Sequence, residues 1–208
     1  MYYKTCTKQN KDSNVPLICE TPTNAIIIYY SVSRFLVILG DYRTNRKERT
    51  EQLFKLRRVY VHPRYNRRRV TNDLAILKLA GKVRYTKTVK RVRLAKPGQN
   101  FVGSTCIISG WGATRGGGPT SNILQFTRVT VITSRRCQRS YDDIFGRVIC
   151  FLSNDRGSGI CDGDSGGPAV CHGVLAGVTS FGVDDCLTHY PSVYTRVSYY
   201  NKYIRQRL

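Results

Sequence analysis

The sequence predicts an all-β fold that ends in one helix. Short apolar or alternating segments recur along the chain, and turn residues such as Gly, Pro and Asn separate them, which is typical of an antiparallel barrel or sandwich. Before residue 198, no segment shows the 3.6-residue apolar period of a helix. With 208 residues, of which 41% are hydrophobic, the chain can bury a real core.

The expected elements follow one another in a regular order. Residues 1–24 are polar and rich in Asn, Lys and Thr, so we expect a loop there. In residues 198–208, Tyr199, Tyr203 and Ile204 share one face, which predicts the C-terminal helix. Between these ends, apolar and β-branched segments predict strands at 25–30, 35–39, 53–61, 74–79, 106–109, 124–133, 148–151, 168–171, 174–181 and 192–197.

Charge and cysteine content indicate the class of protein. The net charge is +21, and such a field attracts sulfated glycans, nucleic acids or anionic membranes, unless the protein is simply basic and soluble. The eight cysteines form no CxxC pair, so disulfides in an oxidising compartment are favoured over zinc or redox motifs. Aromatic residues are scarce between the basic runs, so we expect no sequence-specific binding of nucleic acid.

Neither a signal peptide nor a membrane span is apparent. Residues 1–19 are polar and lack the apolar core of a secretory signal. Residues 25–40 are more apolar, but Ser31, Ser33 and Arg34 interrupt them, and the stretch is too short to cross a bilayer. One explanation of the conflict with a disulfide-bonded, secreted protein is that the first residues are not the native N-terminus.

The stretch Cys161–Pro168 has the features of a nucleophile loop. Its serine, Ser165, has glycine neighbours, which permit a tight turn and the close approach of a substrate carbonyl. After attack, the backbone N–H groups of Gly163 and Ser165 are the natural donors to the resulting oxyanion. The carboxylate of Asp164 beside this anion is unfavourable unless it points away and is neutralised.

This stretch resembles the active-serine segment of the trypsin/chymotrypsin family of serine endopeptidases. The resemblance runs from Val37 to the C-terminus. Any one of its motifs alone would be an ordinary turn or strand, whereas their joint order identifies the chain as a member of the family. These motifs are the Val-His-Pro turn Val61–Asn66, the triad-aspartate segment Asn72–Leu77, the entry to the second barrel Ser109–Gly112, the substrate-pairing strand Ser180–Gly182 and the last pocket wall Tyr190–Val197.

The resemblance implies two antiparallel β-barrels, of which the first is truncated in this chain. Residues 1–35 are expected to be an atypical and poorly ordered N-terminal segment. Residues 36–208 are expected to form the protease domain, with a partial first barrel at 36–100, the second barrel at 101–197 and the helix at 198–208. The family pattern pairs Cys106 with Cys171, Cys137 with Cys150, and Cys161 with Cys186, while Cys6 and Cys19 pair together or stay free.

The resemblance also assigns roles in the site. Ser165 is the nucleophile, Asp73 is the acid that orients the base, and Ser180 supports Asp73 through a hydrogen bond. The oxyanion hole falls on Gly163 and Ser165. Since no acid stands at the base of the pocket, we expect it to take an apolar side chain rather than Arg or Lys. Its residues are Gly159 at the base, then Ile160, Ser180, Phe181, Gly182 and Ser192, and no cofactor is expected.

The catalytic base is missing from the expected place. The family histidine lies in an Ala-Ala-His-Cys motif upstream of Val37, where this chain reads Tyr-Tyr-Ser-Val-Ser-Arg-Phe. The chain's three histidines, His62, His172 and His189, lie in turns, loops or strand ends, so we expect them to be structural or exposed. Because a serine hydroxyl without a base is a poor nucleophile, we predict weak or no peptide hydrolysis.

The family's activating N-terminus has no clear counterpart either. In the family, cleavage frees an Ile-Val-Gly-Gly-like segment whose ammonium pairs with the acid before the nucleophile, here Asp164. Residues 25–28 read Ala-Ile-Ile-Ile and imitate that segment poorly. We therefore expect a zymogen-like oxyanion hole.

Two charged segments have alternative interpretations. Asp41, Glu48 and Glu51 fall in a loop where family members bind calcium. The same loop holds Arg43, Arg46, Lys47 and Arg49, so we expect these cations to satisfy the acids and expect no metal. The basic residues Arg64, Arg67, Arg68, Arg69, Lys82, Arg84, Lys87, Lys90, Arg91 and Arg93 predict a patch for a sulfated glycan or another polyanion.

Three hypotheses of function remain open from the sequence. The first is a secreted, extracellular serine endopeptidase acting on peptides or proteins, whose N-terminal part is lost or altered in this chain. The second is a pseudoprotease that acts through its basic surface as a polyanion- or protein-binding module. The third is an active protease with a displaced base.

Overall fold

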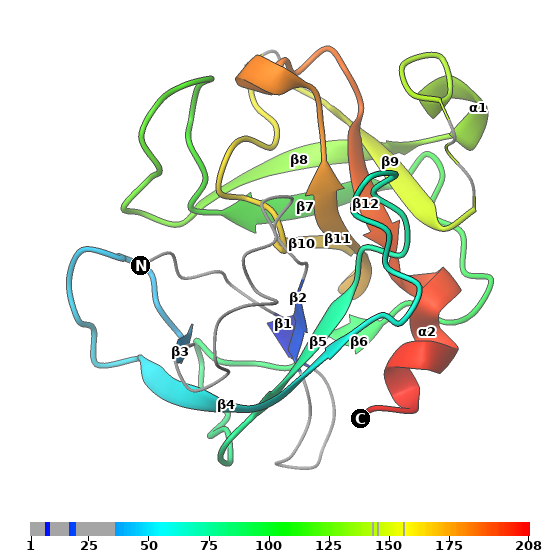
Figure 1. Cartoon of the computed structure of the whole chain (residues 1–208). Coiled ribbons are helices and arrows are strands. Elements are labelled where there is room, and N and C mark those ends of the chain that lie inside the picture. The colour runs from blue at the N-terminus through cyan, green and yellow to red at the C-terminus, as the bar shows by residue number, and fades with distance from the viewer. Residues whose placement is uncertain (1–6, 9–16, 20–35, 143, 145, 156) are drawn as a thin grey trace.

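The computed structural model describes residues 7–8, 17–19, 36–142, 144, 146–155 and 157–208 (Figure 1). Two sheets account for nearly all of the regular structure, and short helices lie beside them. The strands are β1 (Thr7–Lys8), β2 (Leu17–Cys19), β3 (Leu36–Leu39), β4 (Gln52–Val61), β5 (Ala75–Leu79), β6 (Arg93–Leu94), β7 (Thr105–Gly110), β8 (Gln125–Ile132), β9 (Val148–Ser153), β10 (Pro168–Cys171), β11 (Val174–Phe181) and β12 (Ser192–Arg196). The helices are α1 (Ser134–Cys137), the 3₁₀ helix η2 (Asp184–Cys186) and α2 (Val197–Arg205).

The second half of the chain forms a closed antiparallel barrel. Its strands follow the order β10-β7-β8-β9-β12-β11, and the pairing of β10 with β11 closes the ring. The short strand β6 adds to β11 in parallel. Closure removes the unpaired edges that an open sheet would expose. The barrel interior is apolar, and Phe151 and Tyr194 meet edge to face inside it with ring centroids 4.8 Å apart.

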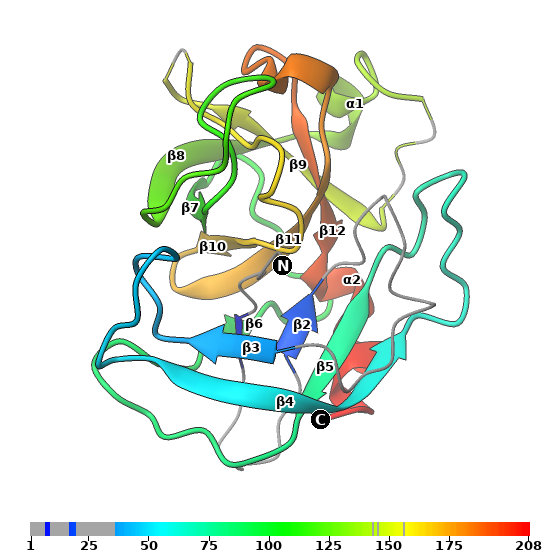
Figure 2. The same ribbon diagram turned by 60° about the vertical axis from the view of Figure 1, so that its left-hand side comes forward.

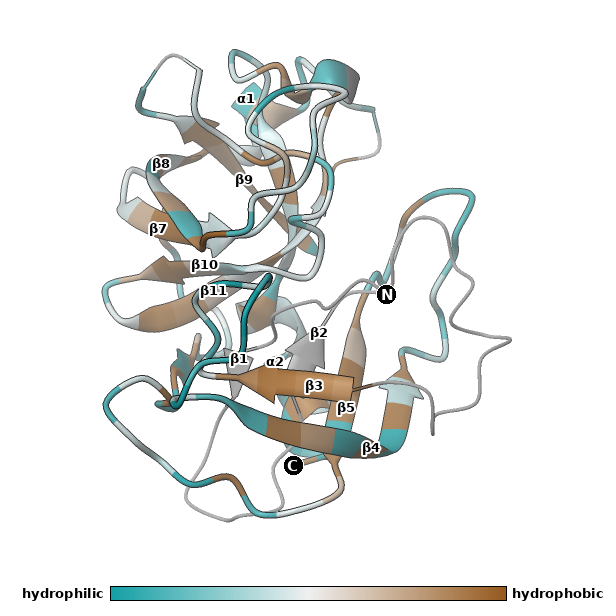
Figure 3. Ribbon diagram, turned by 90° about the vertical axis from the view of Figure 1, so that its left-hand side faces the viewer, coloured by the Kyte–Doolittle hydropathy of each residue, from teal (hydrophilic) through white to brown (hydrophobic). Residues whose placement is uncertain are grey.

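The first half is an open sheet in the order β1-β2-β5-β4-β3 (Figure 2). Its own core is small and consists of residues such as Val37, Leu56 and Val83. From β5 and the residue before it, Ile76 and Leu74 pack instead into the core of the second barrel. The two halves therefore share buried apolar residues, and the fold class predicted from the sequence is confirmed. In the hydropathy view, β3 is apolar along its length, whereas β4 alternates apolar and polar segments (Figure 3).

The C-terminal helix α2 packs its apolar face on the barrel. Ile204 is fully buried, and Tyr200 is 4% exposed. Buried Asn201 donates through its amide to the carbonyl of Ala95, which lies just after β6. None of the helices in the part of the chain that the structure describes has the length and apolarity needed to cross a membrane.

Most strands lie where the sequence predicts them, with shifts of one or two residues at their ends. The prediction of a loop over residues 1–24 is wrong at β1 and β2, because Leu17–Cys19 pairs with β5 and Thr7–Lys8 pairs with β2. The local sequence of a polar segment does not show that part of it will pair with a strand far away in the chain. The strand predicted at 25–30 lies outside the described residues. Helix α1 was not predicted, because a single turn capped by Thr133 is too short for a periodic pattern.

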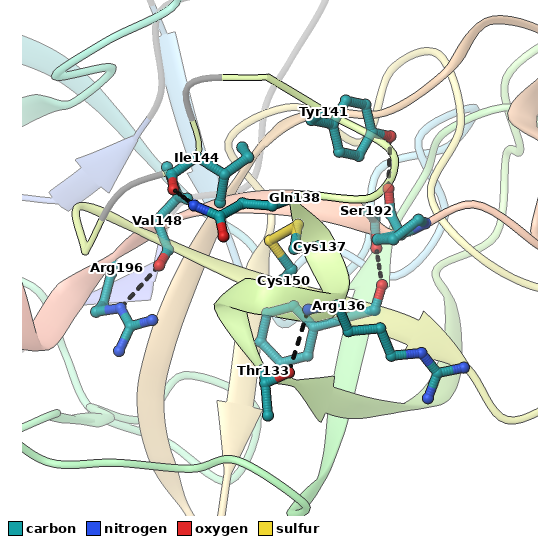
Figure 4. Close-up of a disulfide and its surroundings, with 12 residues drawn as sticks. Thr133, Arg136, Cys137, Gln138, Tyr141, Ile144, Val148, Cys150, Ser192 and Arg196 are labelled. Atoms are coloured by element: carbon teal, nitrogen blue, oxygen red, sulfur yellow. Dashed lines mark hydrogen bonds between the residues drawn. A yellow bond between two sulfur atoms is a disulfide. The ribbon is translucent and has the colours of Figure 1, made fainter.

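Three disulfides join the second half of the chain, and they are the pairs that the resemblance implies. They connect Cys106 with Cys171, Cys137 with Cys150, and Cys161 with Cys186. The Cys137–Cys150 bond ties α1 to β9 (Figure 4). Nearby, Tyr141 donates through its hydroxyl to the carbonyl of Pro191 at 2.6 Å. The pairing of Cys6 and Cys19 lies outside what the structure describes.

Candidate active site

Two backbone turns shape the loop around Ser165. The N–H of Asp164 donates to the carbonyl of Cys161 at 3.0 Å, and the N–H of Gly167 donates to the carbonyl of Asp164 at 2.9 Å. Gly163 has a φ of +99°, and a Cβ there would lie 3.1 Å from the Cα of Gly112. Among the described residues, the N–H groups of Gly163 and Ser165 have no acceptor. Both donors are therefore unpaired, as an oxyanion hole requires, and the zymogen-like state of the hole stays a prediction.

The carboxylate of Asp164 is held by backbone donors. Its Oδ1 accepts the N–H of Gly112 at 2.8 Å, and its Oδ2 accepts the N–H of Cys161 at 3.0 Å. A Cβ on Gly110 or Gly112 would overlap this carboxylate, so both positions require glycine. The predicted role of Ser109–Gly112 was the entry to the second barrel, and this role of its glycines was missed. The two glycines of that motif were the available signal.

Asp164 lines a large cavity. The cavity has a volume of about 440 Å³, and its lining also includes Arg115, Phe126, Asp185 and His189. Phe126 is 69% exposed, which is unusual for a phenylalanine on a central strand. The cavity is the place where the family resemblance puts an activating ammonium beside the acid that precedes the nucleophile.

Asp73 lies between the two halves of the fold. It is 3% exposed, and its Oδ2 accepts the hydroxyl of Ser180 at 3.1 Å. The hydroxyl of Thr195 donates to the carbonyl of Asp73 at 2.6 Å. The family resemblance predicted the Ser180 contact but did not indicate Thr195, because nothing local relates β12 to Asp73, which lies two residues before β5.

Strand β11 links the serine loop to Asp73. The carbonyl of Thr179 accepts the N–H of Gly166 at 3.1 Å, and its N–H donates to the carbonyl of Gly167 at 2.9 Å. The next residue along the strand, Ser180, contacts Asp73. Thr179 and Ser180, which are neighbours on one buried strand, thus fix the position of the Ser165 loop relative to Asp73.

The three histidines occupy other places in the fold. The Nδ1 of His62 accepts the N–H of Arg64 at 3.2 Å, and its ring lies 4.4 Å from that of Tyr203 on α2. His172 lies in the turn between β10 and β11 with a φ of +50°. His189 lines the cavity next to Asp164. The three histidines therefore lie at three different places in the fold.

The predicted side-chain pocket is narrow. Gly159, Ile160, Gly182 and Ser192 line a cavity of about 20 Å³. A Cβ on Gly182 would lie 3.3 Å from the Cδ1 of Ile160, so this isoleucine occupies the space between the walls. Ser180 instead contacts Asp73, and the ring of Phe181 packs on Tyr141 with centroids 5.5 Å apart. The space between these four residues is therefore small, and Gly159 and Ile160 also line the larger cavity beside Asp164.

The acidic loop after β3 brings three carboxylates together. One ligand atom from each of Asp41, Glu48 and Glu51 lies within 4.8 Å of the others. The Oδ1 of Asp41 is buried without a hydrogen-bond partner, and burial together with Glu51 and Glu48 raises the pKa of Asp41. Of the cations expected to satisfy the acids, Arg46 approaches Glu48 at 3.6 Å. The sequence predicted no metal here, but three carboxylates this close could hold a calcium ion, which would relieve their mutual repulsion.

Calcium is therefore expected to stabilise the protein through this loop. At a calcium concentration one hundred times its Kd, the melting temperature should rise by about 5–10 °C, because the ion binds only the folded chain. Differential scanning calorimetry with and without calcium measures this shift. The Asp41→Asn variant should lose the shift, whereas an unchanged melting temperature of the parent chain in about 10 mM calcium would show that the loop does not bind the ion.

The predicted polyanion patch is divided in the structure. Residues 64–69 precede β5, whereas residues 82–91 follow it, so these two groups lie at opposite ends of that strand. Arg84 is placed at the start of β4 by two hydrogen bonds with the side chain of Gln52. Figure 2 shows the two loops on opposite sides of the first sheet. The sequence alone could not separate them, since they are close along the chain.

Comparisons with known proteins agree with this geometry. The family model described as Trypsin matches residues 23–204, and thus begins upstream of Val37. Trypsin II-P29 of Gallus gallus is 34% identical over 178 residues, which cover 85% of this chain and 71% of that protein. Kallikrein-15 of Homo sapiens is 34% identical over 194 residues, which cover 85% of this chain and 74% of that protein.

Solved structures agree as well. The structure of human heparin binding protein has a TM-score of 0.81 and 27% identity to this chain, and the match covers 96% of this chain and 83% of that one. The family match, the closed barrel with its second sheet and the order of the motifs lead to one conclusion. The chain belongs to the trypsin/chymotrypsin-type serine protease family.

Proposed function

We propose that this chain is a serine endopeptidase relative whose hydrolysis of peptides is weak or absent. The observation that carries the proposal is the contrast between a formed nucleophile loop and a missing base. Ser165 lies in a loop held by Thr179, and Asp73 is held by Ser180. His62 and His172, in contrast, belong to other parts of the fold, and His189 lines the cavity beside Asp164, whose lining includes neither Ser165 nor Asp73.

The chemistry follows from which groups are present. In the complete reaction, Ser165 Oγ attacks the scissile carbonyl while a histidine accepts the hydroxyl proton and later returns it to the leaving amine. Without that histidine, the proton must go to water and the serine remains a poor nucleophile. The N–H groups of Gly163 and Ser165 still stabilise the oxyanion, which leaves residual catalysis.

The origin of the missing base is part of this proposal. We infer that the chain derives from a secreted endopeptidase in which the N-terminal part is altered by alternative splicing or by an error in the gene model. The segment Tyr29–Phe35, which stands where the family has Ala-Ala-His-Cys, supports this origin. An upstream exon coding for Ala-Ala-His-Cys would establish it.

Reactivity of Ser165 towards a fluorophosphonate tests the proposal. We expect the purified chain to react about ten-thousandfold more slowly than a trypsin, because loss of one triad member removes most of the acceleration. Any remaining label should disappear in the Ser165→Ala variant. Labelling at the rate of an active protease would contradict the proposal and would favour a displaced base.

Polyanion binding is the second candidate function. Its supporting observation is the distribution of charge: within residues 52–141 the single acid is the buried Asp73, while Lys and Arg recur throughout. The solved structure of a relative carries the name heparin binding protein, which is compatible with this candidate. In this alternative, the protease fold serves as a scaffold for the basic surface.

A further inference from the structure

The loop between β4 and β5 carries several arginines on a backbone that is held by hydrogen bonds. Asn66 and Thr71 exchange two backbone hydrogen bonds, at 3.0 and 3.1 Å. The side chain of Asn66 also accepts the N–H of Arg69 at 3.0 Å, which fixes the tip of this small hairpin. Arg68 and Arg69 are exposed at the tip. Their backbone is therefore ordered before any ligand arrives.

Helix α2 holds both ends of this loop. At one end, the hydroxyl of Tyr203 donates to the carbonyl of Val61 at 3.3 Å, and the ring of His62 lies 4.4 Å from that of Tyr203. At the other end, the hydroxyl of Tyr200 donates to the side chain of Asn72 at 2.9 Å. Both ends of the loop are thus held by α2, and the loop itself projects beyond the first sheet (Figures 2 and 3).

Arg207 joins this surface from the C-terminal side. Its guanidinium lies 3.5 Å from the ring centroid of Tyr203, and its Nη1 donates to the carbonyl of the same residue at 2.9 Å. Burial lowers the pKa of His62, and the charges of Arg207 and Arg64 lower it further. Two arginines from different elements therefore lie near one imidazole.

Acids are missing from the segments that build this surface. No Asp or Glu occurs in residues 52–72 or after Asp185. The guanidinium groups are accordingly not neutralised by neighbours in sequence. An arrangement of fixed, exposed guanidinium groups matches oxyanions with several acceptor oxygens, because the planar fork binds them bidentately.

We propose that Arg64, Arg68, Arg69 and Arg207, the turn–helix surface, bind the sulfate groups of a sulfated polysaccharide. This inference rests on the second candidate function and names its location and ligand class. None of the four arginines belongs to the Ser165 loop, so the surface does not require an active protease, although Arg69 also lines a cavity with Asp73 and Asp142. The surface is separate from the basic residues 82–91 at the other end of β5.

The surface fits a sulfated polysaccharide better than other polyanions. Binding of single-stranded nucleic acid without base readout uses open aromatic faces for stacking. Here the ring of His62 packs against the rings of Tyr200 and Tyr203, and Arg207 covers Tyr203. Membrane surfaces are bound by helices with a free apolar face, whereas α2 buries its apolar face in the core. The three disulfides indicate the oxidising, extracellular setting in which sulfated polysaccharides occur.

Binding of a heparin dodecasaccharide to the full chain tests the proposal by isothermal titration calorimetry at physiological salt. The double variant Arg64→Gln/Arg207→Gln should raise Kd about tenfold, through the loss of two fixed charge contacts. The matched double variant Lys82→Gln/Arg84→Gln removes the same charge at the other end of β5 and should change Kd less than about twofold. If the first variant melts early, Arg68→Gln/Arg69→Gln replaces it at the exposed hairpin tip.

Each other outcome has a distinct meaning. Equal weakening by both double variants would overturn the turn–helix surface while leaving general polyanion binding intact. Failure of the parent chain to bind would overturn the second candidate function as well. Tighter binding of a DNA duplex or of phosphatidylserine vesicles of equal concentration, lost in the same variant, would overturn the ligand class.

Discussion

Replacing residues 1–35 with the corresponding N-terminal segment of a trypsin is expected to raise peptide hydrolysis about ten-thousandfold, because that segment brings the base histidine. It also brings an ammonium for Asp164, whose carboxylate already lines the 440 Å³ cavity. The imported strands take the place of β2, which pairs with β5 in this chain. Hydrolysis of a peptide with a small apolar residue before the scissile bond measures the gain.

Two controls separate catalysis from folding in this chimera. Replacing the imported histidine by alanine, or Ser165 by alanine, should remove the gain while the melting temperature stays the same. The contrary result is a chimera that folds and binds a dipeptide supplying the ammonium for Asp164, yet still fails to hydrolyse peptides. It would refute the view that the nucleophile loop is ready for a base. The fault would then lie in the oxyanion donors or in the narrow pocket.

Substitution Gly112→Ala is expected to destabilise the protein by about 3 kcal/mol, since the added methyl group has no space. Its carbon would lie 2.6 Å from the Oδ1 of Asp164, which accepts the N–H of the same residue. The carboxylate must leave its place or the backbone must move. For a domain of this size, the melting temperature should fall by about 6–12 °C, as measured by circular dichroism.

The matched control for this substitution is Gly146→Ala. A Cβ at Gly146 meets no atom within 4 Å, so the melting temperature should change little. In the Gly112→Ala variant, the cavity beside Asp164 should also lose its shape, and the residual reactivity of Ser165 should fall with it. Equal melting temperatures for the two variants would mean that Asp164 does not depend on Gly112.

The sequence predicted most of the strands because their signals are local. Alternating or apolar segments such as β4 and β11 need no partner to be recognised. The short strands β1 and β2 had no such signal, since their strand conformation depends on pairing with β5. The single-turn helix α1 is capped by a hydrogen bond from the backbone N–H of Arg136 to the hydroxyl of Thr133.

Parts of the site were also readable from the sequence alone. The glycine-rich stretch around Ser165 and the segment with Asp73 are continuous motifs, and the Ser180 contact followed from the family pattern. The roles of Gly110, Gly112 and Thr195 were not readable, because each acts across the fold on a residue far away in sequence. The same applies to the filling of the pocket by Ile160.

By itself, the sequence determined the family, the strand pattern, the nucleophile loop and the lack of a histidine in the expected motif, because these are properties of continuous segments. Only the tertiary structure decided where Asp164 points, how β11 joins Ser165 to Asp73 and how narrow the pocket is. It also divided the basic residues between two ends of β5 and joined one group to α2. These features arise from contacts between distant segments, whose geometry is set by the packing of the shared core rather than by local preference.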